Sequence, residues 1–100
     1  MRYDKLVRDK IPEYIRGKGG APKSHVAETE EYWRKLKEKL QEEVKEFVEA
    51  ENIEEYADVL EVLEAIRDFK QFSEQEIIEV KNKKAEERGK FKDRIILEES

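Results

Sequence analysis

Two pairs of acidic residues have the types and spacing that metal chemistry requires. Glu43 and Glu46 are three residues apart, and Glu55 and Asp58 repeat that spacing further along the chain. Residues three apart in a helix are neighbours on its surface. Carboxylates without His or Cys suit a hard ion, Mg²⁺ or Mn²⁺, which typically keeps water and phosphate oxygens among its ligands. The four residues therefore predict a Mg²⁺ site that also accepts Mn²⁺.

The helical position of Glu43 supports this interpretation. At about 100° per residue, with Leu36 as zero, the apolar side chains of its helix span about −40° to +80°. Glu43 falls at about −20°, Glu46 at about −80° on the edge, and Glu42 at about −120°, toward water. An ionised carboxylate inside an apolar arc is costly unless it is paired or bound to a cation. A single such glutamate is more often paired with Lys or Arg, or used as a cap, so it is the set of four that favours a metal.

The following helix carries two opposite apolar arcs. One arc contains Ile53, Tyr56, Leu60 and Leu63, and the other contains Val59, Val62, Ile66 and Phe69. Glu55 and Asp58 lie on the second arc, one turn before its apolar members. With both faces apolar, this helix is expected to be nearly buried. We therefore expect a homo-oligomer, a homodimer or a homotetramer, in which a partner subunit covers part of it.

Local signals place these residues on helices. Asp9 is a candidate cap for a short helix that Gly17 ends, and a helix is expected over 29–50. Asn52, with an acid three residues later, caps a helix that continues to about Lys70.

Further along, Ser73 opens a last helix with a capping box, and Gly89 ends that helix. Segments 3–7 and 91–97 are expected to be short extended pieces, candidates for pairing with each other. The sequence thus predicts an all-α fold, a bundle of about four helices completed by oligomerisation.

Composition limits the class of protein. A chain of 100 residues, of which 37% are hydrophobic and 47% charged, corresponds to one domain, residues 1–100, with a modest core. The net charge of −5 divides into +4 over 1–27, −11 over 28–79 and +2 over 80–100. An acidic middle argues against nucleic acid as a partner, because phosphate backbones require a basic face.

Membranes and disulfides are not expected either. No apolar run approaches the roughly 20 residues that a membrane span needs, and no signal peptide is recognisable. Cysteine is absent. A cytoplasmic location is therefore expected.

The acidic motif resembles that of a known family. Residues 42–46 read E-E-V-K-E and residues 55–58 read E-Y-A-D. Together they resemble the E-E-x-x-E … E-x-x-D signature of the MazG-like all-α nucleoside triphosphate pyrophosphohydrolases. Residues 3–12 (Y-D-K-L-V-R-D-K-I-P) and 83–91 (K-K-A-E-E-R-G-K-F) also look like the ends of a subgroup described as phosphoribosyl-ATP pyrophosphohydrolase-like. The resemblance covers nearly the whole chain.

This resemblance implies a reaction and a role for each acid. The reaction is hydrolysis of a nucleoside triphosphate to the monophosphate and pyrophosphate by a metal-activated water. The metal ligands carry over to Glu43, Glu46, Glu55 and Asp58. Glu43 also counts as catalytic, together with Glu42, which lies behind the ligands or assists activation of the water.

Basic residues are expected to stabilise the phosphate charge of the nucleotide substrate. The candidates are Lys81, Lys84 and Arg88, which share one helix face, and a second group of Lys5, Arg8 and Lys10. Two alternatives stay open: a phosphoribosyl-ATP pyrophosphohydrolase of histidine biosynthesis, and a non-catalytic helical interaction module whose acids are solvated or salt-bridged.

Overall fold

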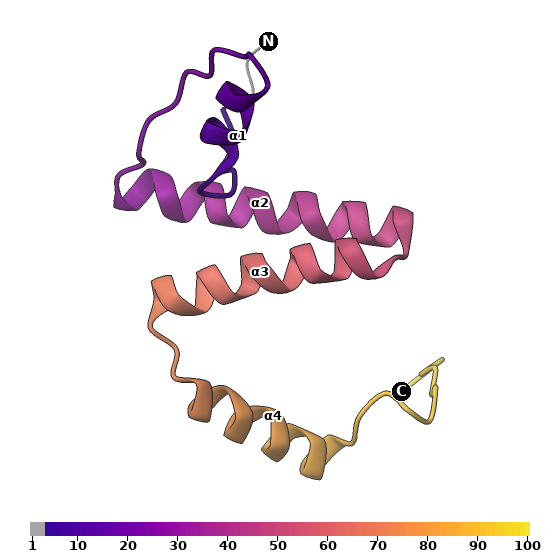
Figure 1. Cartoon of the computed structure of the whole chain (residues 1–100). Coiled ribbons are helices and arrows are strands. Elements are labelled where there is room, and N and C mark those ends of the chain that lie inside the picture. The colour runs from indigo at the N-terminus through magenta and orange to yellow at the C-terminus, as the bar shows by residue number, and fades with distance from the viewer. Residues whose placement is uncertain (1–3) are drawn as a thin grey trace. The chain divides into compact units, whose positions relative to one another are not determined.

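A computed structural model describes residues 4–100, and every regular element in that range is an α-helix (Figure 1). The helices are α1 (Ile11–Gly17), α2 (Thr29–Ala50), α3 (Ile53–Lys70) and α4 (Glu74–Arg88). Residues Met1–Phe69 form one compact unit and Lys70–Ser100 form a second. The all-α fold class is confirmed, whereas the organisation as a single domain stays a prediction. In this part of the chain, no helix combines the length and apolar character that a membrane crossing requires.

Helices α2 and α3 form an antiparallel hairpin in the first unit (Figure 1). Glu51 ends α2 in the left-handed conformation, with φ of 53°, and its N–H donates to the carbonyl of Phe47 at 2.8 Å. The Asn52 side-chain oxygen then accepts a hydrogen bond from the Glu55 N–H at 2.9 Å. This cap satisfies one of the free donors at the start of α3. The predicted limits of both helices are confirmed.

Aromatic contacts at both ends of the hairpin fix the register of α2 against α3. At one end the Trp33 ring stacks on Phe69 with centroids 5.2 Å apart, and Tyr32 meets the same ring edge-on at 5.6 Å. At the other end Phe47 and Tyr56 form an edge-to-face pair at 5.7 Å. Sliding one helix by a turn would break all three contacts, which are in geometries that aromatic pairs prefer. The residues between the two ends are therefore held opposite fixed partners.

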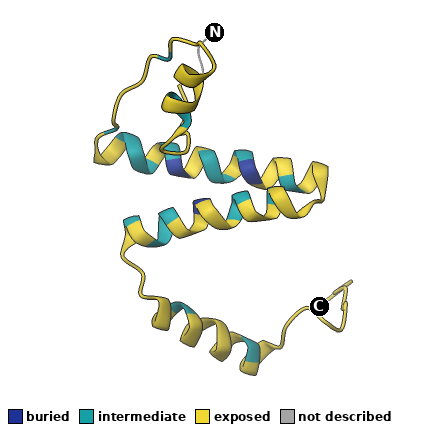
Figure 2. Cartoon of the chain, in the orientation of Figure 1, coloured by how far each residue is buried: buried dark blue, intermediate teal, exposed yellow. Residues whose placement is uncertain are grey.

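The core of the hairpin is small and lies along the seam between the two helices. Leu36 is 1% exposed and Val62 is also buried. Val59, Ile66 and Phe69, from the same arc of α3 as Val62, are half-buried. Figure 2 shows the buried and half-buried stretches on both helices of the hairpin. The second apolar arc of α3 is thus the one that packs within the chain.

The first apolar arc of α3 is exposed in the single chain, because α2 covers only one side of α3. Ile53 is 82% exposed, and Tyr56, Leu60 and Leu63 are also exposed. The expectation of a nearly buried helix included cover by a partner subunit, and it stays a prediction.

Helix α1 begins at Ile11, one residue later than a cap at Asp9 predicts. Lys10 occupies the N-cap position, and no side chain caps the helix. The prediction that Asp9 is the cap is wrong. Pro12 lies in the first turn and has no N–H to offer to a capping side chain. The Ile11 N–H instead donates to the carbonyl of Arg8 at 3.0 Å.

In the second unit, α4 begins as predicted. The Ser73 hydroxyl accepts a hydrogen bond from the Glu76 N–H at 3.0 Å, and Gly89 ends the helix at φ of 82°. Residues 91–97 form a turn followed by irregular chain, and residues 4–100 contain no strand. The predicted pairing of two extended segments is wrong for this range, because an isolated pair of strands is marginal at best. Tyr3, in the N-terminal segment of that prediction, lies outside the described residues.

Because Leu36 is the most deeply buried side chain, Leu36→Ala is expected to lower the free energy of unfolding by about 2–5 kcal/mol. The control Val26→Ala removes methyl groups from a side chain that is 96% exposed, and it should change the free energy of unfolding by less than about 0.5 kcal/mol. Urea denaturation followed by circular dichroism measures both. A small effect of Leu36→Ala would contradict the assignment of the core to this seam.

Candidate metal centre

The hairpin brings five carboxylates together near the end where Phe47 meets Tyr56. Glu42, Glu43 and Glu46 offer oxygens that lie within 4.8 Å of one another, and so do Glu43, Glu55 and Asp58. Glu43 belongs to both groups, so it joins the acids of α2 to those of α3. The predicted convergence of acids from two helices is confirmed as two overlapping triads that share one residue. A divalent ion needs several oxygen ligands that converge in this way.

Glu43 is buried although it is charged. It is 6% exposed, and one carboxylate oxygen, Oε1, lies 3.1 Å from the Lys39 ammonium. The other, Oε2, is buried without a hydrogen-bond partner among the described residues, and the same holds for Oε2 of Glu55. A buried polar atom without a partner is unfavourable, and carboxylates with free lone pairs are more so. These two oxygens fit a bound cation, and the all-oxygen donor set fits Mg²⁺ or Mn²⁺.

Basic side chains neutralise part of the cluster. Lys39 contacts Glu42 at 3.6 Å as well as Glu43. From the segment before α1, Lys5 reaches Glu42 at 3.1 Å and Arg8 reaches Asp58 at 2.7 Å. Three of these acids, Glu42, Glu43 and Asp58, therefore form a salt bridge through one of their two oxygens, as the alternative of salt-bridged acids predicts. Oε2 of Glu43 and Oε2 of Glu55 have no such partner among the described residues.

The charges of the cluster shift the pKa values of three side chains. The hydrogen bond to Glu42 raises the pKa of Lys5. Burial alone would raise the pKa of Glu42, but the hydrogen bond from Lys5 and the charge of Lys39 lower it. Although Glu46 is exposed, desolvation by its neighbours, and after it the nearby charge of Glu43, raise its pKa. Glu46 thus gives up its proton less readily beside another carboxylate, which is the repulsion that a bound cation relieves.

The structure brings some of the predicted phosphate ligands to the acids. Lys5 and Arg8 contact the cluster directly, although they pair with carboxylates here. Lys10 is exposed at the start of α1. The remaining three, Lys81, Lys84 and Arg88, are exposed on α4 in the second unit, and their role stays a prediction.

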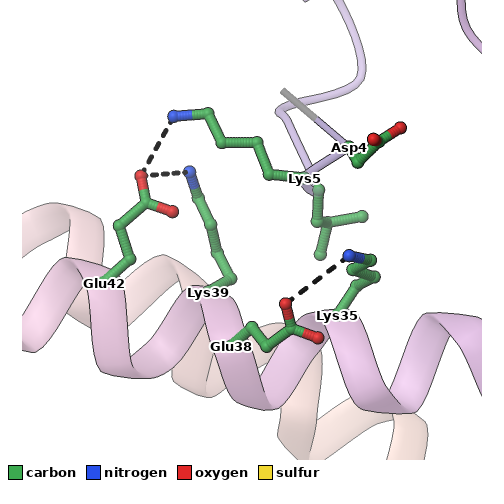
Figure 3. A pocket seen from close by; sticks show the side chains of 7 residues that line it. Asp4, Lys5, Lys35, Glu38, Lys39 and Glu42 are labelled. Carbon is green, nitrogen blue, oxygen red and sulfur yellow. Dashed lines mark hydrogen bonds and ion pairs between the residues drawn. The ribbon is translucent and has the colours of Figure 1, made fainter. Parts of the chain in front are cut away.

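Two lysines of α2 were missed from the sequence. Lys35 and Lys39 line a small hollow, in which Lys39 contacts Glu42 and Lys35 contacts Glu38 (Figure 3). Lys39 is three residues from Glu42 and four from Glu43, and Lys35 is three residues from Glu38. This spacing was the available signal, because residues three or four apart on a helix are neighbours. The signal is weak, since such charge pairs are frequent on exposed helices.

Comparisons with known proteins assign no function to the chain. A segment of 41 residues is 51% identical to part of a protein of Mycolicibacterium smegmatis that is described only as uncharacterized. The match covers 41% of this chain and 42% of the relative. No family model matches the chain. No solved structure matches it either.

The burial of Glu43 generates a test that does not involve activity. Glu43→Leu places an apolar side chain on an apolar seam and removes a buried charge, so the unfolding free energy without metal is expected to stay the same or rise by about 1–4 kcal/mol. Any increase of melting temperature that Mg²⁺ causes in the wild type should be lost.

Calorimetric melting with chelator and with Mg²⁺ measures both effects. Glu49→Leu, at an exposed position of α2, is the control and should keep the Mg²⁺ response. A large loss of stability in metal-free Glu43→Leu would show instead that the Glu43–Lys39 ion pair is a structural requirement.

Proposed function

We propose that this protein is a Mg²⁺-dependent hydrolase that cleaves a nucleoside triphosphate to the monophosphate and pyrophosphate. One observation carries the proposal: Oε2 of Glu43 and Oε2 of Glu55 are buried without a hydrogen-bond partner among the described residues, inside a cluster of carboxylates from two helices. The resemblance of segments 42–46 and 55–58 to the MazG-like signature supports the same reaction. Mn²⁺ is the expected substitute for Mg²⁺.

The acids divide the chemical work. Glu43, Glu46, Glu55 and Asp58 would hold the ion. When bound, the ion supplies a Lewis acid that lowers the pKa of a water molecule and neutralises phosphate charge. Glu42, whose pKa is lowered by Lys5 and Lys39, is an ionised carboxylate at neutral pH and can orient that water or accept its proton. The reaction consumes one water and breaks the anhydride bond between the α- and β-phosphoryl groups.

Basic residues complete the proposed site. Lys5 and Arg8 already lie at the cluster, within 3.1 Å of Glu42 and 2.7 Å of Asp58. Their charges are suited to stabilise the phosphoryl group that is attacked and the one that leaves. Lys10, Lys81, Lys84 and Arg88 are proposed as further contacts with the phosphates.

The rival interpretation is a helical interaction module with salt-bridged acids. It accounts for the pairs formed by Lys5, Arg8 and Lys39, and it gives no reason for a glutamate that is 6% exposed with an unpaired buried oxygen. A leucine would pack that position more favourably. The position of Glu43 therefore favours the enzyme.

The test is pyrophosphate release from a panel of nucleoside triphosphates, with phosphoribosyl-ATP beside them, in Mg²⁺ and in chelator. We expect turnover that needs the metal and falls at least about 100-fold in Glu43→Gln and Glu55→Gln, as removal of charge-stabilising groups does elsewhere. Glu49→Gln, on the exposed side of α2, should keep wild-type activity.

Two other outcomes separate the alternatives. Turnover of phosphoribosyl-ATP alone would assign the chain to histidine biosynthesis. No turnover of any nucleotide, with no effect of Mg²⁺ on melting, would favour the interaction module.

We further propose that the protein is a homo-oligomer, a homodimer or a homotetramer, with itself as partner. The apolar side chains that α2 and α3 leave exposed are Val44, Val48, Ile53, Tyr56, Leu60 and Leu63. Burial of such a face against a second copy is favourable at about 25 cal/mol per Å², and the core of the single hairpin is small. The acidic cluster lies on the same two helices, so oligomerisation would also stiffen its support.

A charge placed on this face tests the oligomer. Leu60→Lys is expected to convert the protein to a monomer, because it would bury an unpaired ammonium in the interface. Light scattering coupled to size-exclusion chromatography gives the mass. Val26→Lys, at an exposed loop position, is the control and should leave the mass unchanged. A wild-type protein that is monomeric at micromolar concentration would contradict the proposal.

A further inference from the structure

A small hollow with three lysines adjoins the acidic cluster. Its volume is about 90 Å³, and it is bounded by the N-terminal segment and by α2 (Figure 3). The lining residues are Asp4, Lys5, Leu6, Lys35, Glu38, Lys39 and Glu42. The proposed reaction so far assigns no phosphate contact to Lys35 or Lys39.

The two lysines of α2 are more covered than is usual for lysine. The Lys39 side chain is 16% exposed and that of Lys35 is 20% exposed, whereas lysines are mostly exposed. Lys45, on the same helix, is exposed. Each covered lysine has its ammonium group at a carboxylate, Lys35 at 3.5 Å from Glu38 and Lys39 at 3.1 Å from Glu43. These two positive charges are thus held at defined places rather than spread over the surface.

The hollow and the acidic cluster share a wall. Lys39 and Glu42 line the hollow, and both contact members of the cluster. Figure 3 shows Lys5 and Lys39 reaching the same oxygen of Glu42, while Lys35 points to Glu38. A ligand in the hollow would therefore lie next to any ion held by Glu42, Glu43 and their neighbours.

The charge of the hollow depends on what the carboxylates bind. Without an ion, the three lysines face three acids, so the lining is balanced. A divalent ion held by Glu43 and the other proposed ligands would neutralise the carboxylate that Lys39 contacts at 3.1 Å. The charge of Lys39 would then be less compensated beside a cation, and the two positive charges together attract an anion with several charges.

We infer that this hollow is a polyphosphate subsite, in which Lys35 and Lys39 bind a phosphoryl group together with Lys5. The inference rests on the proposed function for the ion and deepens it by naming residues for the leaving pyrophosphate. Lysine ammonium groups bind phosphate as point charges. A hollow of about 90 Å³ has room for a small polar group such as a phosphoryl group. Ion and phosphate bind with positive cooperativity, each strengthening the other.

The experiment is calorimetric titration of the full chain with inorganic pyrophosphate, in Mg²⁺ and in chelator, with a blank for the Mg²⁺–pyrophosphate complex. Pyrophosphate is expected to bind at least about tenfold more tightly with Mg²⁺. Lys35→Met and Lys39→Met keep the aliphatic stem and remove the charge, and each should weaken binding in Mg²⁺ by roughly tenfold. Lys45→Met is the matched control on the same helix and should bind as the wild type does.

A second arm identifies which phosphates the hollow takes. A nucleoside monophosphate is titrated in the same way, and its affinity should be insensitive to Lys35→Met if the hollow receives the pyrophosphate end. Sensitivity of the monophosphate instead of pyrophosphate would assign the hollow to the α-phosphate and overturn the assignment made here.

Titration with Mn²⁺, followed by electron paramagnetic resonance, separates phosphate binding from ion binding. Lys35→Met should bind Mn²⁺ as the wild type does, and Lys39→Met should bind it at least as tightly, because a competing cation is removed. If Lys39→Met does not fold, Lys35→Met and the charge-conserving Lys35→Arg, which should retain binding, carry the test.

The subsite and the proposed function fail in different ways. Nucleotide hydrolysis with pyrophosphate binding that ignores both lysine substitutions would overturn the subsite and leave the function. Lysine-dependent pyrophosphate binding without hydrolysis of any nucleotide would overturn the function and leave the subsite.

Discussion

A carboxylate within an apolar seam is the constraint on which the rest of this structure depends. Glu43 is 6% exposed between α2 and α3, and only one of its two oxygens has an ionic partner. The hydrophobic pattern of α2 predicts an apolar residue such as leucine at this position, and a leucine would enlarge a small core. Retaining a charge there lowers the stability of the hairpin. Such a sacrifice is typical of functional sites, where local rules for folding are broken and stability is supplied elsewhere.

The two aromatic ends of the hairpin set the alignment of α2 and α3 around Glu43. Trp33 with Phe69 at one end, and Phe47 with Tyr56 at the other, hold the helices in one register. That register places Glu55 and Asp58 beside Glu43. Acids at matching spacing on two helices do not meet unless the helices are aligned, so the aromatic pairs position the cluster although they contribute no ligand.

Much of this could be predicted from local signals. The limits of α2, α3 and α4 follow from Asn52, Ser73 and Gly89, whose capping chemistry depends on residues within a few positions. The position of Glu43 followed from helical periodicity alone. The predictions that failed are those whose outcome depends on residues distant in the sequence or on a partner strand. Which apolar arc of α3 packs inside the chain depends on α2, and segment 91–97 has no strand to pair with among the described residues.

The ion pairs that Lys5 and Arg8 form could not be predicted for the same reason, because their partners are distant in the sequence. Lys39 is four residues from Glu43 on one helix, so it stays near the cluster whatever else binds. Lys5 and Arg8 come from chain outside any helix, and their ion pairs are more exposed. Exposed pairs contribute little, typically about 0–1 kcal/mol. The chain thus neutralises its acids with one fixed cation and two that a divalent ion can displace at small cost.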